Sequence, residues 1–362
     1  MTKPRLIVVG PVPPPIHGVT VSTSLVLENP VLREHFDVEH FDTSDHRSGR
    51  NVGTWEWKNV WLGLFAVARL ARSLRGDRGI VYLPLSQSPP GFLRDSLFIH
   101  AAHAFGWRVA GHLRGSDFRS FYTSSPSLWR RWMRLTLRRI DSVGVMGSSL
   151  CWVFHGLVPP DRITVVANGT PEPARAGVMR DPEHVLFLSN LRQRKGVVQA
   201  VDAALLVLAR RPTARFTFAG EWESEELERE LRARVAPSRA SIVFSPPVQG
   251  AEKDKLLASS SVLLFPPAEP EGHPRVVLEA LAAGVPVVTT DRGAIRETVV
   301  DGESGYVLAD PVPGVLADRI DTILSDDELR GRLGRAARQR HLDLFTQGAA
   351  DRALAAWLRG LV

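Results

Sequence analysis

Two glutamates around a predicted helix start are the residues of this sequence best suited to chemistry. They lie in the segment Pro267-Ala-Glu-Pro-Glu271-Gly-His-Pro274-Arg-Val-Val-Leu-Glu279, which follows an apolar run typical of a buried strand. Proline is favoured in the first turn of a helix, so Glu271 falls in the loop before that helix and Glu279 in its second turn. The helix start offers unpaired N–H groups and a positive dipole, which suit a phosphate. Glu279 is placed to present its carboxylate to paired hydroxyls, such as those of a ribose.

The elements that must position this segment follow an alternation of strands and helices. In the first half, apolar runs predict strands at 6–9, 79–84, 108–113 and 141–146. Longer amphipathic patterns predict helices at 19–27, 57–74, 90–105 and 127–140. Such alternation builds parallel sheets with helices on both faces, and ligands bind at the carboxyl ends of the strands. We therefore expect one doubly wound α/β domain in the first half.

The same pattern restarts after a stretch rich in Pro, Ala and Gly at 170–182, which is typical of a linker. Strands are predicted at 185–189, 214–219, 241–244, 261–265, 285–290 and 306–308. Helices are predicted at 197–209, 223–234, 251–258, 274–283, 315–323, 326–340 and 348–360. The 362 residues are enough for two domains of roughly 100–200 residues each. We place these domains at 1–175 and 176–347.

The distribution of charge narrows the classes of partner. Residues 1–180 carry 22 Lys and Arg against 13 Asp and Glu, whereas residues 181–362 carry 23 against 26. This asymmetry favours an anionic partner of the first half, such as a phosphorylated substrate or an anionic lipid surface. No zinc spacing, helix-turn-helix or aromatic sheet motif accompanies it, so we expect no nucleic acid partner. The loop Gly10–Gly18 contains four prolines and lacks the Gly-x-Gly-x-x-Gly pattern of a dehydrogenase.

Cysteine content and apolar runs bear on the compartment. The single cysteine, Cys151, forms neither an internal disulfide nor a cysteine-based metal site, which favours a reducing compartment. The first apolar run is too short for the core of a signal peptide. The longest apolar stretch, 60–70, falls short of the ~20 residues that a membrane-spanning helix needs. We expect a cytoplasmic protein.

The glutamate segment also carries a family resemblance. Glu271, followed after seven residues by Glu279 and the run Ala280–Val288, resembles the hallmark of retaining glycosyltransferases of the GT-B type, family 4, also called glycosyl transferases group 1. Further matches occur in the same order along the chain at Gly10–Gly18, Asn168-Gly169, Phe187–Gly196, Gly293–Glu297 and Asp301–Gly305. The resemblance implies two Rossmann-like parallel-sheet domains that face a cleft, an acceptor domain and then a donor domain. It also implies that the C-terminal helix, 348–362, crosses back to the N-terminal domain.

The activity implied by this resemblance is transfer of a hexosyl group from a nucleoside-diphosphate-sugar to an acceptor, with retention of configuration. The acceptor is a glycan, a lipid-linked molecule or a small molecule, and neither a metal nor another cofactor is expected. Glu279 is expected to bind the ribose, and Glu271 with the backbone after it to hold the sugar. Catalytic roles are implied for Glu271, Lys195, and His112 or Arg114. Donor binding is implied for Gly18, Arg194, Lys195, Gly272, His273, Arg275, Val276 and Glu279.

Three positions depart from the family pattern. Many relatives have Gly-Gly where this chain has His17-Gly18, and many have an arginine where it has Asn190. The family often places a histidine at the position of Arg114, whereas His112 lies two residues earlier, on the same strand face. Either His112 or Arg114 is expected to contact the donor sugar or diphosphate. Two further hypotheses remain: a nucleotide-sugar epimerase or hydrolase, and an inactive nucleotide-binding partner subunit.

A predicted helix in the first half separates aromatic and basic residues. Trp129, Trp132, Met133, Leu137 and Ile140 gather on one face, and Arg130, Arg131, Arg134 and Arg138 gather on the other. One interpretation is a core-packed helix with a basic outer face. The other is contact with an anionic membrane at the inner face of the cell membrane, as suits an enzyme acting on lipid-linked acceptors.

Overall fold

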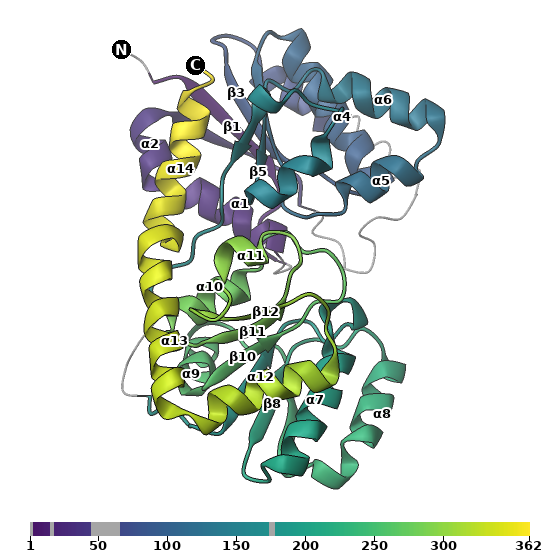
Figure 1. The fold of residues 1–362 in the computed structure, drawn as a ribbon. Helices are drawn as coiled ribbons and strands as arrows, with labels where there is room; N and C mark the ends of the chain where they lie inside the picture. The colour runs from purple at the N-terminus through teal and green to yellow at the C-terminus, as the bar shows by residue number, and fades with distance from the viewer. Residues whose placement is uncertain (1–2, 15–17, 45–65, 174–177) are drawn as a thin grey trace. The chain divides into compact units, whose positions relative to one another are not determined.

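The computed structural model describes residues 3–14, 18–44, 66–173 and 178–362. They form two compact units (Figure 1). Unit 1 comprises Met1–Ala167 with Ala350–Val362, and unit 2 comprises Asn168–Ala349. The acceptor and donor roles of the two units stay a prediction. Within the described ranges, no helix has the length and apolar composition that crossing a bilayer requires.

Unit 1 is built on a six-stranded parallel sheet. In spatial order the strands are β2 (Asp37–Asp42), β1 (Arg5–Gly10), β3 (Gly79–Pro84), β4 (Arg108–His112), β5 (Ser142–Val145) and β6 (Ile163–Val165). The four predicted strands are confirmed. They occupy the centre of the sheet, where both faces are covered, and this is why their sequences are continuously apolar. Neither edge strand, β2 or β6, was predicted. The sequence of β2 is polar, and Phe41 is its one buried residue. Strand β6 has three residues, none of them buried.

Helices cover this sheet on both faces. They are α1 (Gly18–Glu28), α2 (Pro30–His35), α4 (Pro89–Ala104), α5 (Phe118–Ser124) and α6 (Ser127–Leu137), with 3₁₀ turns at Ser148–Phe154 and Pro160–Arg162. The helix predicted at 57–74 lies partly outside the described residues, and 66–73 are helical. His17 also lies outside them.

The last helix, α14 (Gln347–Arg359), packs on the core of unit 1 from Ala350 onward, as predicted (Figure 1). Leu354, Trp357 and Leu358 join the cluster that contains Leu6 and Tyr82. The Trp357 indole N–H donates to Ser142 Oγ at 2.8 Å. At its other end, Asn29 Nδ2, from the residue that caps α2, donates to the Asp351 carbonyl at 3.2 Å.

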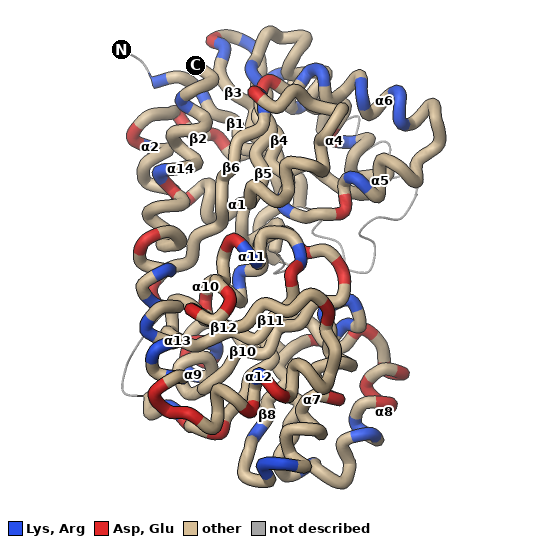
Figure 2. The backbone as a smooth tube through the Cα atoms, viewed as in Figure 1, with Lys and Arg blue, Asp and Glu red and all other residues tan. Residues whose placement is uncertain are grey.

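Helix α6 is a core-packed helix with a basic outer face. Met133, Thr136 and Leu137 are buried, and the Trp132 indole N–H donates to Ser96 Oγ of α4 at 3.1 Å. On the opposite face, Arg131, Arg134 and Arg138 are exposed and Arg130 is half-buried, and Figure 2 shows the basic positions along the helix. The helix ends at Leu137, three residues earlier than predicted, and residues 138 and 139 form a turn before the buried Ile140.

Unit 2 repeats the architecture. Its parallel sheet has the order β12 (Gly305–Leu308), β11 (Val287–Thr290), β10 (Val262–Phe265), β7 (His184–Leu188), β8 (Arg215–Ala219) and β9 (Ile242–Ser245). All six predicted strands are present, with ends within two residues of the prediction. The two sheets together confirm the predicted fold class.

The helices of unit 2 are α7 (Val197–Arg210), α8 (Glu225–Arg234), α9 (Gly250–Ser259), α10 (Arg275–Ala282), α11 (Ile295–Thr298), α12 (Pro313–Ser325) and α13 (Asp327–Arg340), and a π-helical turn spans His341–Phe345. Side chains fix two of the starts. Ser224 Oγ accepts from the Leu227 N–H, and Asp326 Oδ1 accepts from the Leu329 N–H. These caps explain why both helices begin after the first predicted residue.

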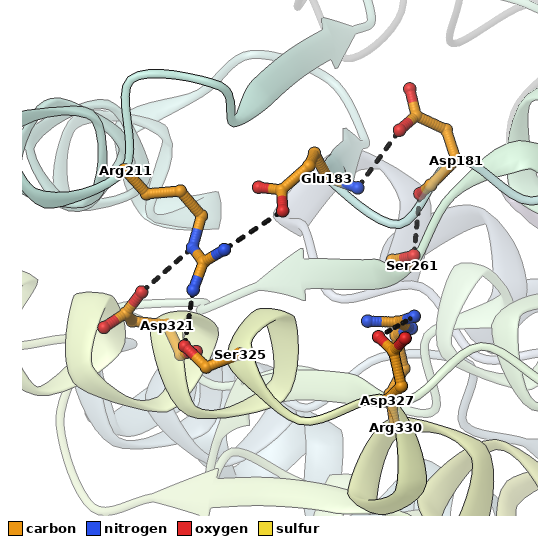
Figure 3. A network of polar contacts seen from close by, with 8 residues as sticks. All are labelled: Asp181, Glu183, Arg211, Ser261, Asp321, Ser325, Asp327 and Arg330. Carbon is orange, nitrogen blue, oxygen red and sulfur yellow. Dashed lines mark hydrogen bonds and ion pairs between the residues drawn. The ribbon is translucent and has the colours of Figure 1, made fainter.

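The amino edge of this sheet holds a polar network (Figure 3). Arg211, just after α7, donates from Nη1 to Glu183 at 3.0 Å, from Nε to Asp321 at 3.2 Å and from Nη2 to Ser325 at 2.5 Å. Burial opposes ionisation of the neighbouring Asp181, but hydrogen bonds from Arg215 and the Glu183 N–H outweigh it and lower the Asp181 pKa. The network ties the starts of β7 and β8 to the end of α12.

Candidate functional site

At the carboxyl edge of the same sheet, two segments pack tightly and are hydrogen-bonded to each other. One is the 3₁₀ turn Gln193–Lys195, which follows β7, and the other is the loop 266–274, which follows β10. Gly196 ends the turn with φ of +77°, and a Cβ there would lie 1.8 Å from the Pro266 carbonyl oxygen. The Ala268 N–H donates to the Arg194 carbonyl at 3.0 Å. Glycine is therefore required at 196, and the turn holds the loop that carries Glu271.

Lys195 and Glu271 form an ion pair across this junction. Lys195 Nζ lies 2.5 Å from Glu271 Oε1, and the two side chains are 25% and 11% exposed. Only Oε1 of this carboxylate has a hydrogen-bond partner among the residues that the structure describes. The structure thus brings together the two residues for which the sequence implied catalytic roles, and it leaves one carboxylate oxygen for a ligand.

Gly293 packs closely against the backbone of the loop that carries Glu271. Its φ is +59°, and a Cβ at this position would lie 1.6 Å from the Glu271 carbonyl oxygen. The Ala294 N–H donates to the carbonyl of the buried Gly272 at 2.9 Å. The motif Gly293–Glu297 therefore acts on the backbone of the glutamate loop.

A second ion pair lies on the helix that follows. Pro274 caps α10, Val276 is half-buried in its first turn, and Glu279 stands in the second turn. Glu279 Oε1 lies 2.8 Å from Lys253 Nζ of α9, and the side chains are 15% and 27% exposed. Sequence reasoning missed Lys253. Its one signal was a lysine near the start of the helix that follows β9.

The His273 ring lies inside unit 2. Its Nδ1 accepts from the Asn168 N–H at 3.1 Å, so the proton is on Nε2, which donates to Thr298 Oγ1 at 2.9 Å. Burial lowers the His273 pKa to about 4, with Glu297 opposing this effect and Arg275 adding to it. Both ring nitrogens are used by the protein, so a donor contact of His273 would involve its backbone.

The two arginines implied in donor binding also have protein contacts. Arg194 Nε lies 3.5 Å from Glu269 Oε2, and both side chains are at least one-third exposed. Arg275 Nη1 donates to the Gly169 carbonyl at 3.2 Å. Arg194 stands beside the Lys195 pair, whereas Arg275 reaches back to the start of unit 2.

The remaining predicted residues lie in unit 1. His112 ends β4 and is fully buried. Its Nδ1 is hydrogen-bonded to the Tyr82 hydroxyl at 3.0 Å, and that hydroxyl accepts from Arg114 Nη2 at 2.8 Å. Burial, together with the charge of Arg114, lowers the His112 pKa well below its ordinary value. His112 and Arg114 are thus linked through Tyr82 and are not side by side on one strand. Of the two alternatives, Arg114 is the one with exposed surface, and Gly18 is exposed at the start of α1.

Comparison with known proteins places this site in context. Residues 171–340 match the family model described as glycosyl transferases group 1. The phosphatidyl-myo-inositol mannosyltransferase of Mycolicibacterium smegmatis is 32% identical over 179 residues, which cover 49% of this chain and 45% of that protein. Spore coat protein SA of Bacillus subtilis is 30% identical over 161 residues, 43% of each chain. The matched segments thus span less than half the length of these curated relatives.

Solved structures resemble the whole chain. Anabaena HepE in complex with UDP and glucose has a TM-score of 0.74 and 18% identity, covering 99% of this chain and 100% of HepE. Sucrose-phosphate synthase from Thermosynechococcus elongatus has a TM-score of 0.74 and 15% identity, covering 99% of each chain. At these identities the likeness concerns the fold, which is that of GT-B glycosyltransferases.

Proposed function

Since residues 171–340 belong to the glycosyl transferases group 1 family, we propose that this chain is a retaining hexosyltransferase that uses a nucleoside-diphosphate-sugar and no metal. The observation that carries the proposal is the pair of Lys–Glu contacts at the carboxyl edge of the unit 2 sheet. Each places a carboxylate beside a lysine near the start of α10, with one oxygen that has no partner among the residues that the structure describes. A donor needs both groups, because its diphosphate is anionic and its ribose and sugar carry hydroxyls.

In the proposed reaction, the bond between the anomeric carbon and the diphosphate oxygen breaks. A new bond forms to the acceptor hydroxyl on the same face of the sugar, and the hydroxyl proton passes to the departing diphosphate. Negative charge grows on that diphosphate as the bond breaks. Lys195, Arg194 and the first N–H groups of α10 then stabilise the transition state more than the bound donor.

Glu271 and Glu279 bind different parts of the donor in this proposal. The unpaired oxygen of Glu271 accepts hydrogen bonds from the sugar hydroxyls, and that of Glu279 accepts them from the ribose. Lys195 keeps Glu271 in place and faces the diphosphate. No protein nucleophile takes part, because the acceptor attacks from the side that the diphosphate leaves.

A nucleoside-diphosphate hexose as donor is supported by a structural neighbour, since Anabaena HepE has been crystallised with UDP-glucose. A lipid-linked acceptor is supported by the mannosyltransferase named after phosphatidyl-myo-inositol. We carry both classes over to this chain as proposals.

The surface of α5 and α6 supports a membrane-bound acceptor. Residues 118–140 contain six arginines and no Asp or Glu (Figure 2). On this surface Leu128 is 79% exposed and Leu135 is 42% exposed. Exposed leucines among unopposed arginines suit the interface of an anionic bilayer, where apolar groups insert and cations meet phosphates. We propose that unit 1 contacts such a surface from the cytoplasmic side.

Vesicle flotation tests the membrane proposal. Binding to vesicles containing phosphatidylglycerol should weaken as salt rises, and the triple variant R131Q/R134Q/R138Q should lose most of it. A triple variant in unit 2, R229Q/R319Q/R335Q, controls for loss of charge alone. Equal binding by both variants would refute a specific role for α6.

The activity is tested by nucleotide release from UDP-, GDP-, ADP- and dTDP-sugars, with and without a lipid or glycan extract. Release that needs one donor and the extract, and that is lost in E271Q and K195M, supports the transferase. Release without an acceptor indicates a hydrolase, and conversion of the donor sugar without release indicates an epimerase. Nucleotide binding with no turnover indicates an inactive partner subunit. Anomeric configuration is then read from the product by NMR, and a chelator tests the need for a metal.

A further inference from the structure

Lys253 lies outside every motif of the sequence, yet it contacts the glutamate expected at the ribose. It stands near the start of α9, and Glu279 stands 26 positions later on α10. Their 2.8 Å contact joins the two helices at the carboxyl edge of the unit 2 sheet. From this contact we infer that Lys253 orients Glu279 and thereby makes the site distinguish ribose from deoxyribose. The inference rests on the proposed function.

The geometry of the carboxylate supports this role. Among the described residues the Glu279 carboxylate has one hydrogen-bond partner, Lys253, which contacts Oε1 alone. Fixing one oxygen removes the rotation of the carboxylate and aims the other oxygen in one direction. An acceptor that is aimed before the ligand arrives loses less entropy on binding. Lys253 is therefore a positioning residue that acts through Glu279.

Charge gives the contact a second effect. The Glu279 carboxylate lies on the helix whose start is expected to receive the diphosphate, and two anionic groups close together repel each other. The Lys253 ammonium compensates this carboxylate locally. Lys195 does the same for Glu271, so each glutamate of the site has its own lysine.

Matched nucleotides separate this role from simple attraction of phosphate. A lysine that binds phosphate strengthens ribo- and deoxyribonucleotides equally, because both carry the same diphosphate. A lysine that orients Glu279 strengthens the ribonucleotide more, since the 2′-hydroxyl is one of the groups that the carboxylate binds. The ratio of the two dissociation constants is therefore the informative quantity.

The experiment is calorimetric titration of the full chain with UDP and dUDP, GDP and dGDP, and ADP and dADP. We expect the wild type to prefer the ribonucleotide of its base by roughly tenfold or more, as for a hydrogen bond to a charged acceptor. K253M should bring that ratio to roughly twofold or less, because the aim of Glu279 is lost. K253R should retain most of the preference.

Further variants make the test selective. Lys255 is exposed on the same helix, so K255M controls for removal of a lysine and should leave the ratio unchanged. In E279Q the ratio should already be low, and adding K253M should lower it no further, since Lys253 acts through Glu279. K253Q serves in the same way if K253M unfolds, and urea unfolding of each variant verifies the fold.

The outcomes are distinct. If K253M weakens both nucleotides equally and keeps the ratio, Lys253 acts on the phosphates and the inference is wrong, while the proposed function stands. A wild-type chain that binds nucleotides without preferring ribose also overturns the inference. A wild-type chain that binds none of these nucleotides overturns the proposed function as well.

Discussion

The two edges of the unit 2 sheet both carry charged pairs, but the pairs use their hydrogen-bonding groups differently. At the amino edge, the three guanidinium nitrogens of Arg211 donate hydrogen bonds to Glu183, Asp321 and Ser325. At the carboxyl edge, Glu271 and Glu279 each accept a hydrogen bond from one lysine through one carboxylate oxygen. A cation that joins three partners from different elements stabilises the fold, whereas a carboxylate that one lysine holds beside a helix start is placed to bind a ligand.

A position at the carboxyl edge of the sheet does not by itself make a residue functional. His273 lies at the carboxyl edge, in the middle of the glutamate motif, yet both of its ring nitrogens are bonded within the protein. It resembles Arg211 in this respect and differs from its neighbour Glu271. The partners that a residue has inside the protein, taken together with its position, therefore predict the effect of each substitution.

The largest expected effect is loss of turnover in K195M. Removing the cation that faces the growing charge should lower kcat by about 10²–10³-fold, as for other fixed electrostatic groups. The unfolding free energy should fall by about 1–3 kcal/mol, because the Glu271 carboxylate, which is 11% exposed, loses its cation. Turnover assays and urea unfolding measure the two effects. A K195M variant that turns over normally would remove Lys195 from the site.

The buried His273 is expected to make the stability of the protein depend on pH. Its pKa is about 4 when folded and about 6.5 when exposed, so below pH 6.5 the unfolded chain binds a proton that the folded chain does not. Stability is therefore fully present above pH 6.5 and falls toward pH 4. Between pH 7.5 and pH 5 this one residue should cost about 2 kcal/mol.

Urea unfolding of wild type and H273F at several pH values checks this. H273F should lose about 1–3 kcal/mol at pH 7.5, since the Asn168 N–H lacks an acceptor. Its stability should then fall less steeply with acid than that of the wild type, with the buried His112 supplying part of the remaining slope. Equal slopes in the two proteins would show that the His273 ring is not a neutral, buried group.

The fold was largely predictable because its central strands are apolar without interruption. Each run such as Leu6–Val9 or Val262–Phe265 is buried on both faces and has one interpretation. The edge strand β2 escaped prediction because its sequence, polar except at Val38 and Phe41, matches a loop as well as a strand.

The candidate site was predictable only where its residues lie in one continuous segment. Glu271 and Glu279 follow from the helix start between them. The Lys253 contact depends on how α9 lies against α10, and the orientation of the His273 ring depends on Asn168, 105 positions away. Local sequence does not encode such contacts, so they emerge from the packing alone.

Substitution of Arg211 is expected to lower stability and to leave turnover unchanged. R211M should lower the unfolding free energy by about 1–2 kcal/mol, because three partners in a half-buried network lose their donor. It should leave kcat unchanged, since the network lies before the first residues of β7 and β8, at the sheet edge opposite to Glu271. R211K tests the geometry, because a lysine replaces the charge but not the three directed bonds. A loss of kcat in R211M without loss of stability would contradict the division between the edges.

The smallest effect is expected for a pair at the carboxyl edge that is open to water. Arg296 Nε lies 2.7 Å from Asp291 Oδ2, with side chains 63% and 39% exposed. Water competes for both partners, so R296Q should change the unfolding free energy by no more than about 0.5 kcal/mol and leave kcat as it is. Urea unfolding and the turnover assay, run beside K195M, measure both. A marked loss of turnover in R296Q would mean that nearness to the glutamate loop is enough to make a charged residue functional, even where its pair is open to water.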